Sequence, residues 1–209
     1  MKNILVINAS PNKSDSYSRL LTERFIKLWK QKNPNDTFIF RELGNSNIPH
    51  IDQPWIKSAF TPVEARNDES KQAIAFSDAL VKELENADII IIGSPMHNLS
   101  VPSTLKAYID QVIRMDVTTS VVPGTPDSPY IGLLANKKAY LFLVRGGYGF
   151  GRGEIYEHMD FQEPYLKAVL KMIGVTDVTS VTMNYTTMRE ELQLNSFSQA
   201  QAQIDMLFR

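Results

Sequence analysis

Three short segments of the sequence hold the side chains and glycines from which a binding site could be built. The first covers residues 9–18 and carries hydroxyl groups at Ser10, Ser16 and Ser18, just before a helical pattern. Serine hydroxyls and the free N–H groups of a helix N-terminus together form an anion site, so this segment predicts phosphate binding. The alternative is that Ser16 or Ser18 only caps the helix. The segment has neither a Gly-Lys-Ser/Thr ending nor the spaced glycines of a dinucleotide site, which favours a terminal monophosphate over a pyrophosphate.

The second segment covers residues 94–99. Here Pro95 keeps the chain extended, and the Asn98 carboxamide and nearby backbone amides are able to line the edge of a planar ring. The alternative is an ordinary strand-to-helix turn in which Ser103 caps the following helix.

The third segment covers residues 145–151 and has glycine at four of its seven positions. Glycines such as Gly146 and Gly147 let backbone N–H groups approach a ligand without interference from a Cβ atom. A flexible turn is the alternative interpretation.

Few side chains are candidates for proton transfer, and we predict no obligatory catalytic residue. His97 lies in the second segment, and Tyr156 and His158 follow the third, so these three are the possible assisting groups. The histidines are not spaced as metal ligands on a helix and the chain has no cysteine, so we predict no metal site.

Each of the three segments follows a predicted β-strand. Residues 89–93 are an uninterrupted apolar run, which is typical of a strand buried on both faces of a parallel sheet. Four further strands are predicted, and helical patterns alternate with all five: residues 4–8, 37–42, 138–144 and 178–183. Such alternation predicts a parallel α/β sheet, in which ligands bind beyond the carboxyl ends of the strands. The three segments are therefore expected to converge.

The helices are predicted from apolar side chains at helical spacing, and Gly174 is expected to end the fourth helix. The four stripes are Leu20, Leu21, Phe25 and Leu28; Ala73, Phe76, Leu80 and Leu84; Leu105, Tyr108, Ile109 and Val112; and residues 165–173. Residues 188–208 are expected to form a surface helix. Residues 48–68 and 117–134 are too long for ordinary connections. Their aromatic side chains Trp55, Phe60 and Tyr130 favour a lid or a dimer contact over simple disorder.

Composition limits the possible functions. A chain of 209 residues with 43% hydrophobic residues is expected to form one domain. Its formal net charge is −1 without long basic clusters, so neither nucleic acid nor a membrane surface is an expected partner. The absence of cysteine leaves redox chemistry to a bound cofactor. The chain starts without a signal-like segment and has no apolar run long enough to span a bilayer, which predicts a cytoplasmic protein.

Three sequence motifs resemble one family. They are Ser10 with Ser16-Tyr17-Ser18; Pro95-Met96-His97-Asn98-Leu99 with Leu105-Lys106-Ala107-Tyr108-Ile109-Asp110; and Lys137-Lys138-Ala139 leading to Val144-Arg145-Gly146-Gly147. The resemblance starts at Lys2-Asn3-Ile4-Leu5-Val6. Over nearly the whole chain the sequence is similar to the FMN-dependent NADH-azoreductases, also described as FMN-dependent NADH:quinone oxidoreductases and formerly labelled acyl carrier protein phosphodiesterases.

The resemblance implies a flavodoxin-like three-layer sandwich, with a five-stranded parallel sheet in the order 2-1-3-4-5 and helices on both faces. It also implies three groups of residues that bind FMN. Ser10, Ser16, Tyr17 and Ser18 would hold the phosphate; Pro95, Met96, His97, Asn98 and Leu99 would line the isoalloxazine; and Val144, Arg145, Gly146 and Gly147 would meet its pyrimidine end.

The implied activity is two-electron transfer from NADH or NADPH, through tightly bound FMN, to quinones or azo compounds by a ping-pong mechanism. The implied assembly is a homodimer with a shared active site. Arg114, Arg145 and Arg152 are candidates to meet the extra phosphate of NADPH. The alternative function is that of a flavodoxin-type electron carrier, which needs no nicotinamide.

Overall fold

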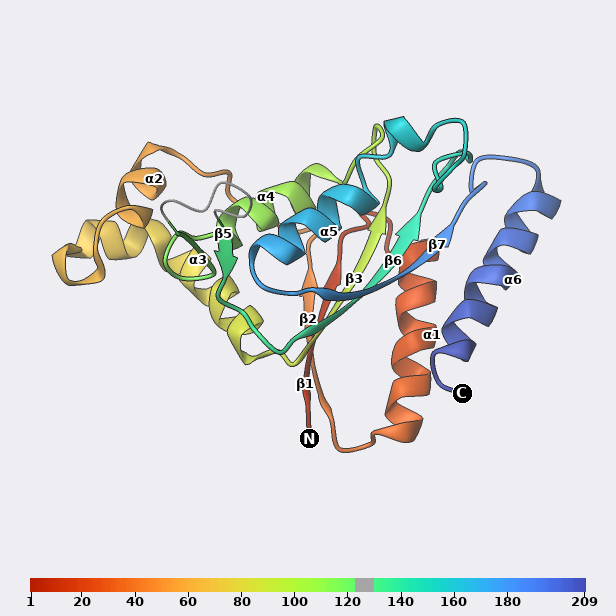
Figure 1. The fold of residues 1–209 in the computed structure, drawn as a ribbon, viewed down its shortest axis with the longest axis horizontal. Helices are drawn as coiled ribbons and strands as arrows, with labels where there is room; N and C mark the ends of the chain where they lie inside the picture. The colour runs from red at the N-terminus through yellow and green to blue at the C-terminus, as the bar shows by residue number, and fades with distance from the viewer. Residues whose placement is uncertain (123–129) are drawn as a thin grey trace.

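The computed structural model describes residues 1–122 and 130–209, and its central element is a five-stranded parallel sheet (Figure 1). The strand order is β2-β1-β3-β6-β7. The bounds are β1 Asn3–Asn8, β2 Thr37–Glu42, β3 Ile89–Pro95, β6 Lys138–Val144 and β7 Asp177–Met183. The five predicted strands and the order 2-1-3-4-5 are thus confirmed, with ends that differ by no more than two residues.

Helices cover both faces of the sheet, which gives the three layers that Figure 1 shows. The helices are α1 Tyr17–Lys32, α2 Gln53–Ala59, α3 Asp68–Asn86, α4 Ser103–Val112, α5 Glu163–Met172 and α6 Glu190–Met206, with short 3-10 turns η1 Val63–Ala65 and η2 Glu157–Met159. On one face, alternate strand residues such as Ile7 and Ile92 pack against α3, α4 and α5. On the other, Val6 and Ile91 pack against α1 and α6. The period-2 alternation of strand side chains explains why one continuous apolar run serves both layers.

Two of the predicted stripe residues lie outside the core. Leu20 and Phe76 are exposed, whereas Thr22 and Ser77, which are polar, are buried. Small hydroxyl side chains fit where helices pack closely, and they can hydrogen bond between helices: the Ser77 hydroxyl in α3 donates to the carbonyl of Gln111 in α4. A count of apolar residues alone could not identify these positions. Gly174 lies just after α5 with φ of 103°, in agreement with its predicted role.

The two long connections contain secondary structure. Residues 48–68 include α2 and η1, and Trp55 in α2 is buried, with its Nε1 donating to Gln111 Oε1 at 2.8 Å. Trp55 therefore packs within its own chain, and the lid or dimer contact expected of residues 48–68 stays a prediction. Residues 117–134 include the antiparallel strands β4 Thr119–Val121 and β5 Tyr130–Gly132. The three prolines of this connection, at positions 123, 126 and 129, lie outside the described residues.

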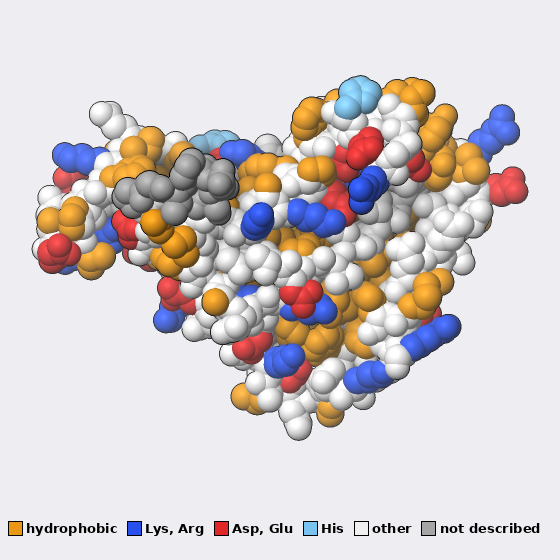
Figure 2. All heavy atoms as spheres, viewed as in Figure 1, with side chains coloured by type: hydrophobic (Ala, Val, Ile, Leu, Met, Phe, Trp, Pro, Cys, Tyr) orange, Lys and Arg blue, Asp and Glu red, His pale blue; other side chains and the backbone are white. Residues whose placement is uncertain are grey.

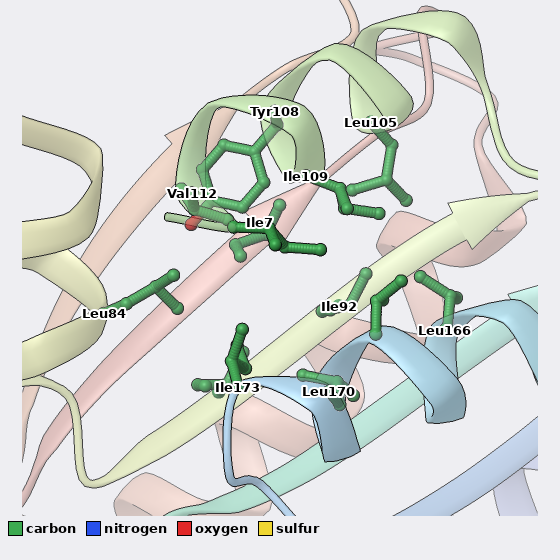
Figure 3. Close-up of a pocket in the computed structure, with 13 residues that line it drawn as sticks. Ile7, Leu84, Ile92, Leu105, Tyr108, Ile109, Val112, Leu166, Leu170 and Ile173 are labelled. Carbon is green, nitrogen blue, oxygen red and sulfur yellow. The ribbon is translucent and has the colours of Figure 1, made fainter. Parts of the chain in front are cut away.

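A small cavity remains between the sheet, α4 and α5 (Figure 3). Its volume is about 30 Å³, and its lining is apolar, with Ile7, Ile92 and Leu166 among the side chains. Such a cavity offers a water molecule no polar partners. It belongs to the core rather than to the binding site that the sequence predicts.

The described residues also bear on membranes and metals. None of the helices in residues 1–122 and 130–209 is long and apolar enough to cross a bilayer. Within the same ranges, no three histidine, aspartate or glutamate side chains come together as possible metal ligands.

Candidate functional site

The three predicted segments meet at one edge of the sheet. They follow β1, β3 and β6, which are neighbouring parallel strands, and so all three leave the sheet at its carboxyl end (Figure 1, upper edge). Backbone hydrogen bonds join them: Ala9 N–H donates to Gly93 C=O at 2.9 Å, and Met96 N–H donates to Val144 C=O at 2.7 Å. The predicted convergence of the segments is therefore confirmed.

The first segment leads into the N-terminus of α1. Ser16 is the N-cap of α1, and its hydroxyl accepts from the N–H of Arg19 at 3.4 Å. Ser16 Oγ also lies 3.1 Å from Ser18 Oγ, and both residues are buried. This contact uses one of the two hydroxyl hydrogens and leaves the other for a ligand. The first N–H groups of α1, including that of Tyr17, have no acceptor within the helix.

Sequence reasoning missed two residues that hold Ser10. The Ser10 carbonyl accepts from Arg19 Nη2 at 2.9 Å, and Arg19 Nε donates to Asn12 C=O at 3.1 Å. Gly44 passes so close that a Cβ atom there would lie 1.9 Å from the Ser10 oxygen. Because Gly44 follows β2 and Arg19 faces the loop from α1, only the tertiary structure brings them together.

The second segment forms a tight turn over residues 97–100. His97 and Ser100 exchange backbone hydrogen bonds of 2.9 and 3.0 Å, and Asn98 and Leu99 have φ of 47° and 71°. Positive φ at both central residues is the pattern of a type I′ turn, which Asn tolerates and Leu rarely adopts. His97 and Asn98 are exposed and line a cavity of about 400 Å³ with Lys106.

The helix after this turn is not capped as the alternative interpretation assumed. Helix α4 begins at Ser103 itself, with Pro102 at the N-cap and no side-chain hydrogen bond. Proline fixes a φ that suits entry into the helix but offers no capping oxygen. The prediction that Ser103 caps the helix is therefore wrong.

The third segment begins with a buried arginine. Arg145 Nη2 lies 2.7 Å from Asp160 Oδ2, and Arg145 Nε donates to Gln162 Oε1 at 3.4 Å. The Gln162 Nε2 donates in turn to the Ser94 carbonyl at 3.1 Å. These contacts tie the ends of β3 and β6 to the segment before α5. The guanidinium of Arg145 points into the fold, and the backbone N–H of Arg145 donates to Met183 C=O at 2.8 Å.

The glycines of the third segment differ in what they contribute. Gly149, and Gly153 just after the segment, have φ of 85° and 79°, which other residues rarely adopt. A Cβ atom at Gly146 would instead lie 3.1 Å from the Thr187 side chain, and one at Gly147 would lie 3.4 Å from the Phe150 ring. Gly146 is therefore constrained by its own chain.

The loop after β7 lies at the same edge of the sheet as the candidate site, and no sequence motif pointed to it. Tyr185 N–H donates to Gly147 C=O at 3.0 Å, and the Thr187 hydroxyl donates to Gly146 C=O at 3.0 Å. Residues 184–188 thus pair with the glycine segment although nearly forty residues separate the two.

The possible assisting groups are spread around the site. His97 lies in the second segment, whereas Tyr156 and His158 are exposed beyond the third, in and before η2. Tyr156 N–H donates to Gly149 C=O at 2.7 Å, and its ring lies 6.0 Å from that of Phe150. No described contact joins His97 to either of the other two.

The comparisons with known proteins cover nearly the whole chain. A family model described as flavodoxin-like fold matches residues 2–207. A protein of Nostoc sp. named FMN-dependent NADH:quinone oxidoreductase is 41% identical over 96% of this chain and 95% of its own length. A protein of the same name from Azotobacter vinelandii is 35% identical over 98% of both chains.

Solved structures agree on the fold. An azoreductase from Bacillus anthracis superposes with a TM-score of 0.88 and 22% identity, and the match covers 100% of this chain and 99% of that chain. A second structure, of an FMN-dependent NADH-azoreductase from Bacillus anthracis in complex with FMN, has a TM-score of 0.84 and 21% identity. The upper edge of the sheet described above is thus built on a fold that the two enzymes share.

Proposed function

This chain belongs to the FMN-dependent NADH:quinone oxidoreductase and azoreductase family, which has the flavodoxin-like fold, and on that premise we propose its activity. The chain is an oxidoreductase that uses NADH and bound FMN to reduce quinones or azo compounds. FMN supplies the two-electron chemistry, since it exchanges hydride equivalents with one substrate at a time. The chain itself has to bind the cofactor, orient it and admit the two substrates in turn.

The observation that carries the proposal is the donor set at the end of β1. Two buried serine hydroxyls, Ser16 and Ser18, lie 3.1 Å apart at the N-terminus of α1. The first turn of α1 has no acidic side chain that would repel an anion. Hydroxyl donors and free helix N–H groups suit a terminal phosphate, so the residues present fit FMN.

We assign the residues of the site in three groups. Serine hydroxyls and N–H groups of the first loop hold the phosphate, the turn after β3 lines the ring, and the end of β6 meets its pyrimidine edge through backbone atoms. The three groups are Ser10, Ser16, Tyr17 and Ser18; Pro95, Met96, His97, Asn98 and Leu99; and Val144, Arg145, Gly146 and Gly147.

NADH is the proposed donor in preference to NADPH. Recognition of NADPH needs positive charge for its extra phosphate, yet two of the three candidate arginines are buried. Arg145 pairs with Asp160, and Arg114 Nη1 lies 3.1 Å from Asp78 Oδ1. Arg152 is the exposed candidate.

We also propose that the enzyme is a homodimer whose subunits share the active site. Ile155, Tyr156 and Phe161 are exposed between β6 and α5, where Figure 2 shows hydrophobic side chains gathered at the top of the molecule. Contiguous exposed apolar side chains beside a site are typical of an interface. Light scattering coupled to gel filtration is expected to give the mass of a dimer, and a monomer mass would contradict this proposal.

The activity is tested with the visible spectrum of protein loaded with FMN under anaerobic conditions. Addition of NADH is expected to bleach the flavin band, and addition of benzoquinone is expected to restore it. Binding of FMN without bleaching by NADH would point to an electron carrier, which is the rival function. Failure to bind FMN would reject the proposed site itself.

A further inference from the structure

Two tyrosine rings stack beside the glycine segment. The ring centroids of Tyr148 and Tyr185 lie 5.1 Å apart with an interplanar angle of 20°. Tyr148 directly follows Gly147, and Tyr185 lies in the loop after β7. The two rings come from segments far apart in the sequence, so the stack exists only in the folded chain.

Hydrogen bonds fix this pair to the backbone of the proposed flavin site. Tyr185 N–H donates to Gly147 C=O at 3.0 Å, and the hydroxyl of Thr187 donates to Gly146 C=O at 3.0 Å. Gly146 and Gly147 are the residues assigned to the pyrimidine end of the ring. The tyrosine stack therefore adjoins that end of the site.

The backbone at Tyr185 is held in an unfavourable conformation. Its φ is 68°, in the left-handed region that a bulky L-residue rarely adopts. A glycine would occupy this position without that penalty, and Met188 N–H closes the turn on the Tyr185 carbonyl at 3.0 Å. Residues with strained backbone conformations cluster at functional sites. The strain at Tyr185 therefore suggests that its side chain has a functional role.

The stack also presents an uncharged aromatic surface. Tyr148 is 48% exposed, and Tyr185 is partly exposed. Neither residues 146–151 nor residues 184–188 include a charged side chain. Such a surface suits a neutral planar ring, because aromatic rings stack in offset arrangements.

We propose that Tyr148 and Tyr185 form a stacking subsite for the outer ring of an extended acceptor, such as a two-ring quinone or a diaryl azo compound. The proposal rests on the proposed function. It explains how the enzyme would distinguish a two-ring acceptor from a one-ring acceptor, since only the larger molecule reaches beyond the flavin to the stack.

The test compares two quinones in steady-state assays of the FMN-loaded enzyme. In Tyr148→Ala and Tyr185→Gly, the KM for 1,4-naphthoquinone is expected to rise by about three- to tenfold, the range that one aromatic stacking interaction gives. The KM for 1,4-benzoquinone is expected to change by less than about twofold, because its single ring gains nothing from the stack. The glycine variant also relieves the strain at position 185, so it is expected to fold.

Two controls separate stacking from general disturbance. Tyr148→Phe keeps the ring and is expected to keep both KM values. Phe40→Ala removes one ring of another stacked pair, Phe38 and Phe40 on β2, in which Phe40 is 52% exposed. That change is expected to leave the naphthoquinone KM unaltered.

A binding measurement gives a second readout. Calorimetric titration of the oxidised protein with 2-naphthol, a two-ring ligand that NADH does not reduce, is expected to show weaker binding in Tyr148→Ala by the same factor. Equal changes for both quinones, or no change for naphthoquinone, would overturn the subsite. A wild-type protein that NADH does not bleach would instead reject the proposed function and, with it, this inference.

Discussion

The guanidinium of Arg145 lies 2.7 Å from the carboxylate of Asp160, and both side chains are almost completely buried. The pair joins the end of β6 to the turn before α5, and Gln162 extends it to the end of β3. An arginine next to the proposed flavin is thus a structural link rather than a ligand for phosphate.

Loss of the ion pair between Arg145 and Asp160 is expected to destabilise the fold strongly. Arg145→Met leaves Asp160 buried without its cation, which is expected to lower the free energy of unfolding by about 3–5 kcal/mol. Urea unfolding followed by circular dichroism measures the change. The matched control is Arg24→Met, which breaks the partly exposed pair of Arg24 with Asp205 and is expected to cost less than about 1 kcal/mol. Similar losses in the two variants would contradict the structural role of Arg145.

Replacement of Ser16 separates capping from phosphate binding. Ser16→Ala removes the N-cap of α1 and is expected to lower the free energy of unfolding by about 1 kcal/mol. It is also expected to weaken FMN binding by about tenfold, the effect of one lost hydrogen bond to a charged group. Asn67→Ala removes the equivalent cap of α3, where Asn67 Oδ1 accepts from Ser70 N–H at 2.9 Å. Fluorescence titration with FMN should find wild-type affinity in that control. If both variants lose affinity equally, Ser16 acts only as a helix cap and does not bind the phosphate.

The backbone conformation of the turn after β3 is predicted to lower the stability of the fold. Leu99 has a φ of 71°, which is strained for a residue other than glycine. Leu99→Gly relieves this backbone strain and is expected to raise the free energy of unfolding by about 1 kcal/mol. Thermal unfolding of the apoprotein measures this change. Asn98→Gly makes the same backbone change at the neighbouring residue but removes the carboxamide assigned to the flavin edge, so it is expected to weaken FMN binding. A stability loss in Leu99→Gly would show that its side-chain packing outweighs the strain.

Tyr108 is a buried phenol whose hydroxyl has no hydrogen-bond partner in the described structure. Tyr108→Phe removes this unpaired polar group and is expected to raise the free energy of unfolding at pH 7 by about 1 kcal/mol. Urea unfolding checks the value, with the half-exposed Tyr130→Phe as a control that is expected to show no change. A loss of stability in Tyr108→Phe would indicate that the hydroxyl has a partner in solution.

Alkaline pH is expected to destabilise the fold through Tyr165. Burial is the main cause that raises the pKa of Tyr165 from 10.0 to about 12, and the charge of Asp110 adds to it. The folded chain then retains a phenol proton that the unfolded chain releases, so stability is full below pH 10 and falls as pH rises toward 12. Burial also raises the pKa of Tyr108, so the comparison is made in Tyr108→Phe protein. There, Tyr165→Phe is expected to flatten the decline in urea midpoint, and an unchanged decline would contradict the assignment.

The sequence by itself determined the sheet and the place of the proposed site. Uninterrupted apolar runs such as residues 89–93 specify buried parallel strands, and the strand order followed from the family resemblance. Because loops that follow parallel strands leave the sheet at the same end, the convergence of three loops could be predicted without coordinates. Local rules also placed Ser16 before α1 and Gly174 after α5.

The tertiary structure alone decided which side chains face the site. Whether Arg145 meets a ligand or Asp160 depends on a contact between residues fifteen apart, and no local pattern encodes it. The same holds for Gly44 against Ser10 and for Tyr185 against Tyr148. These contacts depend on the path of the chain between strands, whereas periodicity reports only which face of an element is buried.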